Sequence, residues 1–196
     1  MTFGYKIGWL AVPRRAPEEV AAAIGLSEPA RVGWAEGVDG AYDAALFVCP
    51  PVAGWTLVAG TTLLEASMTP AWGTWLARLS EPLGEVQYFG THRVIEYQAW
   101  WRARAGRLVR AFTFLGESGE VLANLGEQTA EEADLGLPYV DPAMSTDAFW
   151  DLPGLVLPDE SHVLALAGRW SIDPTALDEP AGPGEGLLGR LPHVTR

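Results

Sequence analysis

The segment Thr91-His92-Arg93, between two predicted strands, holds the residue best suited to acid–base chemistry. Its histidine, His92, is followed by the carboxylate of Glu96, which a tight turn would bring close to the ring. A histidine beside a carboxylate can act as a general base. A lone His–Glu pair has no diagnostic spacing, however, and a turn histidine hydrogen-bonded to the backbone is the simpler interpretation. The sequence therefore marks His92 and Glu96 as candidate site residues without predicting a reaction.

A second group of candidate residues lies on the predicted strand 94–104, VIEYQAWWRAR. Side chains alternate between the two faces of a strand, so one face here is apolar and buried and the other is largely wet. The wet face holds Glu96, Gln98, Trp100, Arg102 and Arg104. Tryptophan and arginine dominate the binding energy of protein interfaces. We therefore expect Trp100, Arg102 and Arg104 to anchor a protein-binding surface.

Trp100 has a competing interpretation as an ordinary core residue. A predicted helix near the C-terminus carries Leu164 and Trp170 on its apolar face, and this face would cover the strand. The chain has nine tryptophans, so many of them must simply pack inside the protein. From the sequence, both interpretations stay open.

Signatures of cofactor and metal enzymes are absent from the sequence. It contains no GxxxxGK[ST], no GxGxxG after a strand, no HExxH and no GxSxG. The three histidines are scattered, and the acidic region lacks the twelve-residue spacing of a calcium loop; its members are Asp141, Asp147, Asp151, Asp159 and Glu160. Cys49, the only cysteine, follows an apolar strand and is expected to be a buried small hydrophobe. We expect no cofactor and no metal, and the sequence leaves open whether the protein is an enzyme.

The charge of the chain limits the classes of partner. The formal net charge is -12 and the isoelectric point about 4.6. This argues against sequence-independent binding of nucleic acid or of an anionic membrane, since both need basic patches. An acidic surface suits a basic protein partner, or it serves solubility alone. No leader segment or membrane-length apolar run is evident, so a cytoplasmic location is expected.

Two blocks of predicted elements must position these residues. The first runs strand 6–12, helix 17–24, strand 44–50, strand 54–60, helix 70–79 and strand 85–90. This is the split β-α-β order of ferredoxin-like folds. The second block is a meander over 84–127. The predicted fold is α+β, with a mostly antiparallel sheet, a ferredoxin-like β-α-β-β-α-β start extended by the β-meander, and helices packed on one face. Two smaller sheets are the alternative.

Tight turns predict the register of the meander. A two-residue Ala105-Gly106 loop places Arg104 opposite Arg107, and a Ser118-Gly119 turn follows. The apolar pairs that result are Ala99–Phe112 and Tyr97–Phe114 in the first hairpin, and Phe114–Ala123 and Phe112–Leu125 in the second. A slip of one residue would expose them.

The rest of the chain predicts one domain over 1–178 and a Gly/Pro-rich tail over 179–196. Thr129 and Glu132 form a capping box that predicts a short helix. Asp159 or Ser161 is the predicted N-cap of an amphipathic helix that ends at Trp170. The tail shows no periodicity, so we expect it to be mobile or to lie along the surface.

Four phrases of the sequence resemble phrases of uncharacterised single-domain bacterial proteins, some of which occur beside small antitoxin or immunity-type proteins. They are PPVAGWTLVAG, FGTHRVIEYQAWWRARAGRLVRAF, GEVLANLGE and AGRWSIDPTALD. The resemblance covers residues 45–178 and carries no catalytic motif. It implies a fold and a bacterial setting rather than an activity, and the use of one lysine beside twelve arginines is also typical of GC-rich bacteria.

Three functions of different classes follow from these observations. The first is a non-catalytic protein-binding domain, as an immunity-type or regulatory partner of a basic protein. The second is a small-molecule-binding protein or enzyme whose cleft lies between the sheet and the Pro-rich loop near His92, with Trp55, Tyr97 and Trp150 as its lining. The third is a purely structural role. The sequence predicts no oligomeric state.

Overall fold

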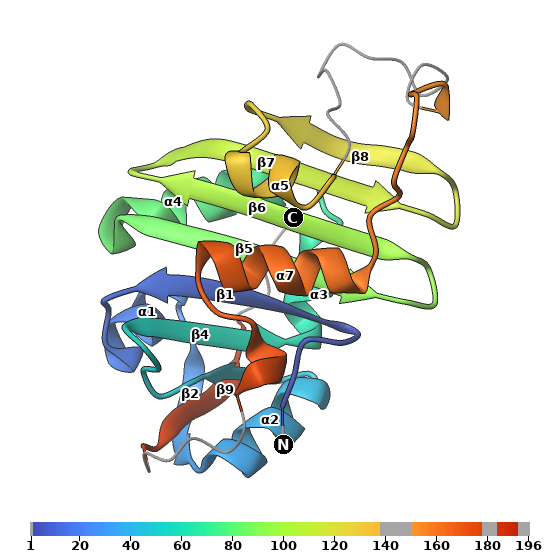
Figure 1. Ribbon diagram of the computed structural model, residues 1–196. Helices are drawn as coiled ribbons and strands as arrows, with labels where there is room; N and C mark the ends of the chain where they lie inside the picture. Colours follow the sequence, from blue (N-terminus) through green and yellow to red (C-terminus); the bar gives the residue numbers. More distant parts are fainter. Residues whose placement is uncertain (1, 138–149, 178–183, 192–196) are drawn as a thin grey trace.

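One antiparallel sheet organises the computed structural model, which describes residues 2–137, 150–177 and 184–191 (Figure 1). Nine strands of the described residues follow the order β2-β9-β3-β4-β1-β5-β6-β7-β8. Their bounds are β1 Ile7–Pro13, β2 Ser27–Val32, β3 Leu46–Val48, β4 Trp55–Gly60, β5 Glu85–His92, β6 Tyr97–Arg104, β7 Arg107–Leu115, β8 Glu120–Leu125 and β9 Gly186–Arg190.

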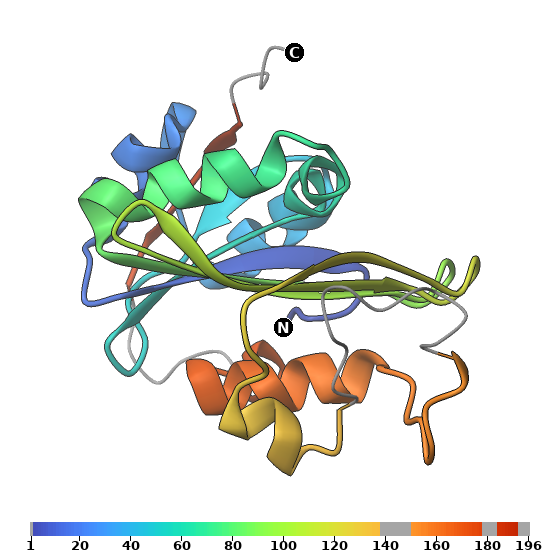
Figure 2. The same ribbon diagram turned by 90° about the horizontal axis from the view of Figure 1, so that it is seen from above.

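Helices cover both faces of the sheet (Figure 2). Their bounds are α1 Pro17–Ile24, α2 Trp34–Tyr42, α3 Thr61–Ser67, α4 Trp72–Leu83, α5 Ala130–Asp134 and α7 Glu160–Trp170, with a 3-10 turn at Pro174–Ala176. Helices α1, α3 and α4 pack on one face, and residues of α2 and α7 join the core on the other. The α+β class is confirmed, but the expectation of helices on one face alone is wrong. Both faces carry large apolar side chains, so each needs a cover.

The predicted ferredoxin-like start is present in the sheet. Strand β4 lies between β3 and β1, and β1 lies between β4 and β5, all antiparallel. Helices α1 and α4, which connect these strands, both pack on the same face. The meander of β5 to β8 then extends the same sheet instead of forming a second one.

A β-bulge changes the predicted register of the first meander hairpin. Arg104 does lie opposite Arg107, but the register shifts between Arg102 and Ala103. As a result Ala99 lies opposite Thr113, Tyr97 opposite Leu115 and Trp100 opposite Phe112. Trp100 and Phe112 therefore share one face. The predicted alternation along β6 is correct, since Tyr97, Ala99 and Ala103 lie on the other face, but the face predicted to be wet is buried as well. A bulge adds one residue to one strand, which alternation alone does not reveal.

The second hairpin differs from its prediction for two reasons. Leu115 lies opposite Glu120, so the loop is longer than the predicted Ser118-Gly119 turn, and Phe114 lies opposite Val121 rather than Ala123. A register shift between Thr113 and Phe114 then takes back one of these two positions, so Phe112 lies opposite Asn124 rather than Leu125.

Helix α2 occupies most of a stretch that the sequence analysis left without an element. Its apolar residues Trp34, Val38 and Ala41 face the core, but two glycines interrupt the pattern. Gly37 has a packing reason, since a Cβ at this position would collide with the ring of Phe47. Glycine lowers helix propensity, so the helix depends on its tertiary contacts.

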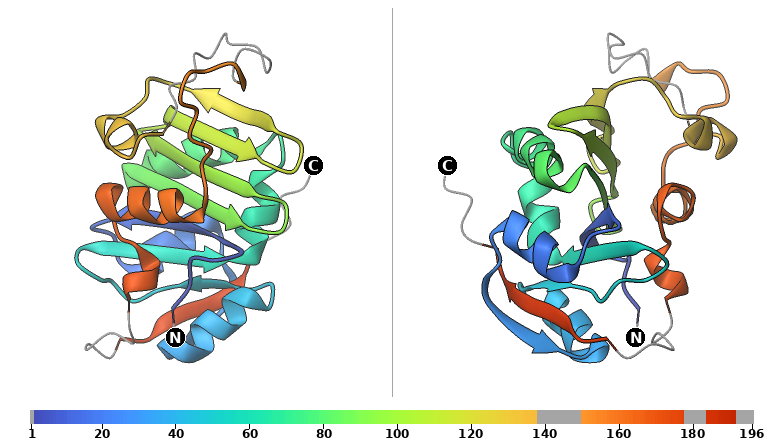
Figure 3. Two further views of the ribbon diagram at one scale, coloured as in Figure 1. Left: turned by 45° about the vertical axis from the view of Figure 1, so that its right-hand side comes forward. Right: turned by 90° about the vertical axis from the view of Figure 1, so that its left-hand side faces the viewer.

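The predicted tail over residues 179–196 contains a strand of the sheet, β9. Residues Gly186–Arg190 pair with β2 on one side and with β3 on the other, and Figure 3 shows β9 beside β2. Leu187 is 7% exposed and packs with the core on the α1 face. The segments 178–183 and 192–196 lie outside the described residues.

Because β9 is an interior strand, replacing a buried residue in it should destabilise the whole sheet. We expect Leu187→Ala to lower the free energy of unfolding by about 2–3 kcal/mol, the usual effect of truncating a buried leucine. Urea unfolding followed by circular dichroism measures this. Arg190→Ala, at an exposed position of the same strand, is the control and should change little. Equal stability of both variants and the unsubstituted protein would mean that the strand does not contribute.

Candidate functional site

Trp100 lies in the core and is not a surface anchor. Its side chain is 1% exposed and stacks on Phe112 with ring centroids 4.6 Å apart. Its indole Nε1 donates a hydrogen bond to Glu132 Oε1 at 2.6 Å. Of the two interpretations offered for this residue, core packing under C-terminal elements is the one that the structure shows.

Glu132 also accepts hydrogen bonds from a buried arginine. Arg110 donates from Nε at 3.0 Å and from Nη2 at 2.7 Å to Glu132 Oε1, and the two residues are 4% and 1% exposed. Arg110 Nη1 donates to Asn124 Oδ1 at 2.8 Å. The predicted capping box is confirmed as well, since the backbone N–H of Thr129 donates to Glu132 Oε2 at 2.8 Å. This cluster connects α5 to β6, β7 and β8.

Arg102 and Arg104 meet at one carboxylate. Arg102 Nε lies 2.8 Å and Arg104 Nε 2.7 Å from the two oxygens of Glu85. The Arg102 guanidinium also lies 5.0 Å from the ring centroid of Trp170. Arg102 is thus bound within the fold, whereas Arg104 stays half exposed and lines a cavity of about 390 Å³ with Arg14.

These contacts change the titration of Glu85. Partial burial raises its pKa, but hydrogen bonds from Gln87, Arg102 and Arg104 outweigh burial and leave the pKa below its ordinary value of 4.5. A carboxylate with a lowered pKa stabilises the fold at pH values above 4.5, and the stabilisation is lost as the pH falls toward the folded-state pKa.

His92 and Glu96 flank the turn between β5 and β6 without forming a catalytic pair. His92 pairs with Tyr97 across the hairpin, and its Nδ1 is buried with no hydrogen-bond partner among the described residues. Glu96 is exposed and has a φ of 51°. No hydrogen bond joins the two side chains in the described part of the chain, so the geometry supports neither a general base nor a backbone-bonded histidine.

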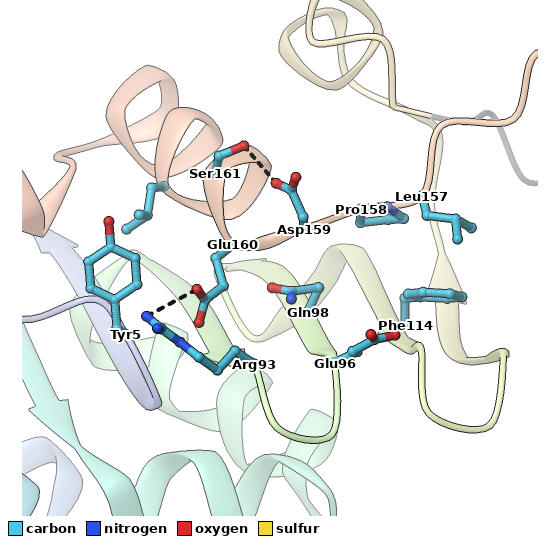
Figure 4. Close-up of a pocket in the computed structure, with 11 residues that line it drawn as sticks. Tyr5, Arg93, Glu96, Gln98, Phe114, Leu157, Pro158, Asp159, Glu160 and Ser161 are labelled. Carbon is cyan, nitrogen blue, oxygen red and sulfur yellow. Dashed lines mark hydrogen bonds and ion pairs between the residues drawn. The ribbon is translucent and has the colours of Figure 1, made fainter.

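A cavity of about 560 Å³ opens beside Glu96, between the sheet and the segment that leads into α7 (Figure 4). The second functional hypothesis placed a cleft in this region. The residues that it named lie elsewhere, because Tyr97 lines a different groove and neither Trp55 nor Trp150 lines the cavity. His92 does not line it either.

The charged groups around this cavity are mostly carboxylates. Glu96, Asp159 and Glu160 line it together with one cation, Arg93. Arg93 Nη2 lies 3.5 Å from Glu160 Oε2, and its guanidinium lies 5.5 Å from the ring centroid of Tyr5.

Asp159, one of the two predicted alternatives, is the N-cap of α7 and accepts a hydrogen bond from His162 N at 3.1 Å. Partial burial raises the pKa of Asp159, but hydrogen bonds from Ser161 and His162 prevail and hold this pKa below its ordinary value. The carboxylate is therefore anionic at neutral pH.

Two buried oxygens at the cavity have no hydrogen-bond partner among the described residues. They are Oε1 of Gln98, a residue that is 3% exposed, and Oε1 of Glu160. Figure 4 shows the Gln98 amide directed toward the Glu160 carboxylate. Buried polar atoms are nearly always hydrogen-bonded in folded proteins, so we expect a water or a ligand to donate to these two oxygens.

A second groove, of about 540 Å³, lies on the opposite face, between the α3–α4 connection and β6 to β8. Its lining is largely apolar and includes Met68, Trp101, Leu122 and Leu125. Met68, Leu122 and Leu125 are 45%, 50% and 44% exposed. The groove borders β8, the last strand of the sheet.

Only some of these residues could be predicted from the sequence. Gln98 stood on the strand face that it singled out, and Asp159 and Glu160 stood in its acidic region, but nothing in the sequence brought the two segments together. Leu125 was predicted to lie opposite Phe112 on the apolar face of the sheet, and no role was predicted for Leu122. No sequence pattern marked Tyr5 as a site residue.

Among the described residues, no group of three or more His, Cys, Asp or Glu side chains is placed to hold a metal ion. Asp141, Asp147 and His193 lie outside those residues. Cys49 is fully buried, and burial raises the pKa of its thiol far above the ordinary value. No helix in the described ranges is long and apolar enough to cross a membrane.

Comparison with known proteins gave no relative: no protein-family model, no curated protein and no solved structure matches this chain. The resemblance to bacterial immunity-associated proteins stays a prediction.

The buried ion pair should be essential for stability. We expect Glu132→Gln to lower the free energy of unfolding by about 3–5 kcal/mol, because it leaves the Arg110 charge buried without a carboxylate. Urea unfolding at pH 7 measures the difference. Glu127→Gln, the same change at an exposed position nearby, should have almost no effect. Similar stability of the two variants would contradict the assignment.

The lowered pKa of Glu85 predicts a pH-dependent contribution to stability. We expect Glu85→Gln to destabilise the protein at pH 7, and the difference from the unsubstituted protein to shrink as the pH falls below 4.5, the ordinary pKa of this group. Unfolding curves at pH 7, 5 and 3.5 test this. Glu81→Gln, at an exposed glutamate of α4, should show no such trend, and a constant difference for Glu85→Gln would refute the prediction.

Proposed function

We propose that this protein binds another protein at strand β8 and the apolar groove beside it. The observation that carries the proposal is an edge strand next to a groove with exposed leucine and methionine side chains. An edge strand presents unpaired N–H and C=O groups, and many complexes form by adding a partner strand to such an edge. Exposed apolar side chains in the adjoining groove add area that a partner can bury.

The two edges of the sheet differ in a way that favours β8. Edge strand β2 contains Pro29, which has no N–H to donate, and a register shift between Ser27 and Ala30. Both features discourage strand addition. The sequence of β8, EVLANL, contains no proline and no basic residue.

The charge around β8 suggests the chemistry of the partner. Glu120 begins the strand, Glu117 and Glu127 flank it, and the formal net charge of the chain is -12. A basic protein with an extended apolar segment would complement both the groove and its rim. Electrostatic attraction of this kind speeds association and weakens with salt.

The function predicted from the sequence is kept, but the binding surface is now assigned to β8 and the groove beside it. Leu122, Leu125 and Met68 are the proposed anchors instead of Trp100. We assign the protein the role of an immunity-type or regulatory partner of a basic protein in the bacterial cytoplasm. The missing catalytic motif, the charge and the sequence resemblance support this role, and the same charge supports the prediction that it binds neither nucleic acid nor a membrane.

Affinity purification with matched variants tests the proposal. The tagged protein, expressed in bacteria of its native background, should retain a basic protein in stoichiometric amount at low salt and release it at high salt. The double variant Leu122→Lys, Leu125→Lys should lose this partner, because lysine on an edge strand opposes strand addition and repels a basic protein.

Val109→Lys is the matched control. Val109 is 41% exposed on β7 and does not line the groove, so the same substitution there should leave the partner bound. Equal retention by the double variant, or no stoichiometric basic protein at low salt, would reject the proposal.

A further inference from the structure

We propose that the cavity between residues 93–96 and the start of α7 binds a small organic amine, a protonated primary ammonium group with a short apolar arm. This binding site is separate from the β8 groove and does not depend on the proposed function. Its walls come from β6, β7, the β5–β6 turn, the segment before α7 and Tyr5 (Figure 4).

The two unpartnered oxygens define the chemistry of the missing group. Oε1 of Gln98 and Oε1 of Glu160 are both acceptors, both buried, and both without a donor among the described residues. An acceptor ligand such as a carboxylate or phosphate cannot satisfy them. A primary ammonium carries three N–H donors and no acceptor, so one such group placed between Gln98 and Glu160 would satisfy both oxygens.

The balance of charge at the cavity also selects a cation. Three carboxylates face one guanidinium, that of Arg93. Arg93 is a weak competitor for Glu160, because its side chain is 57% exposed and its contact of 3.5 Å involves only Oε2. Oε1 of Glu160 stays available for a second cation.

The apolar part of the lining limits the shape of the ligand. Phe114, Leu157 and Leu164 form part of the wall, and Phe114 and Leu164 are 2% and 6% exposed. The volume of about 560 Å³ falls in the range of small-molecule sites. An alkyl chain of a few carbons bearing the ammonium would contact these side chains while its charged end reaches Gln98 and Glu160.

A protonated alkylamine has two natural sources, a free amine and the lysine side chain of another protein. The probes are chosen to separate them. n-Butylamine carries the alkyl chain of lysine without a backbone, and N-acetyl-lysine N′-methylamide carries the same chain with one. 1-Butanol lacks the charge, and tetramethylammonium has the charge but no N–H donor.

Titration of the isotope-labelled full chain with each probe, followed by amide NMR shifts, measures binding. We expect saturable shifts at residues 96–98 and 159–161 with one or both amines, and binding at least about tenfold weaker for 1-butanol and tetramethylammonium, which lack one charge-assisted hydrogen bond or more. Tighter binding of n-butylamine identifies a free amine as the ligand, and tighter binding of the capped lysine identifies a protein side chain. No saturable shift with either amine, or equal binding of 1-butanol, would overturn the proposal.

Two substitutions at the cavity should change affinity in opposite directions. Glu160→Gln keeps the shape and removes the charge, and should weaken amine binding about tenfold. Arg93→Gln removes the competing cation and should strengthen binding. Glu36→Gln, an equal charge change at an exposed residue outside the cavity, should leave binding unchanged.

Circular dichroism and the dispersion of the amide spectrum establish that each variant is folded before titration. A purely structural role for Arg93 and Glu160 predicts the same direction for both variants, since each breaks the same ion pair. That result would overturn the proposal.

Discussion

The buried ion pair between Arg110 and Glu132 is the constraint on which one half of the structure depends. Two charges with almost no exposure are tolerated because they are paired and hydrogen-bonded: Trp100 and the Thr129 backbone donate to Glu132, and Asn124 Oδ1 accepts from Arg110. These bonds fix the position of the short helix α5, which has little stability of its own. With α5 in place, the aromatic face of β6 and β7 is closed, and α7 has a neighbour to pack against.

Large apolar side chains on both faces explain why helices cover both sides of the sheet. Trp9, Phe89, Trp100 and Phe112 fill one face, whereas Leu10, Val86 and Tyr88 fill the other. Most predicted elements were correct because hydrophobic periodicity and turn residues are local signals. No local signal encodes the bulge on β6–β7, which places Phe112 on the face of Trp100 instead of that of Ala99. The face of Trp100 is buried because α5 and α7 cover it, and this depends on tertiary contacts. Helix α2 was missed because its two glycines serve packing, Gly37 against Phe47 and Gly40 against Leu188, rather than helix formation.

The candidate sites show a similar limit. Residue type marked Glu96, Asp159 and Glu160 as polar groups of interest, but the cavity exists only because α7 lies beside the β5–β6 turn. Gln98 indicates a binding site because its buried Oε1 has no hydrogen-bond donor among the described residues. This is a property of the folded protein and cannot be predicted from the residue type. Trp100 illustrates the opposite case, in which a residue type typical of interfaces serves the core through Glu132. The exposure of Leu125 on β8 was not predicted, because the assumed turn placed it opposite Phe112 instead of Ala111.

Strand β9 has a consequence for how the chain reaches its folded state. It joins β2 to β3, and Ser27 and Arg190, which it brings together, are 163 positions apart. Until β9 has paired, β2 has no partner strand and the edge of β3 that faces away from β4 has unpaired backbone groups. Contacts between such distant positions form slowly, because the entropy of closing the long loop is lost before they are made. On the ribosome, the sheet therefore stays unfinished until residues 186–190 have emerged, and aggregation is most to be expected during that interval.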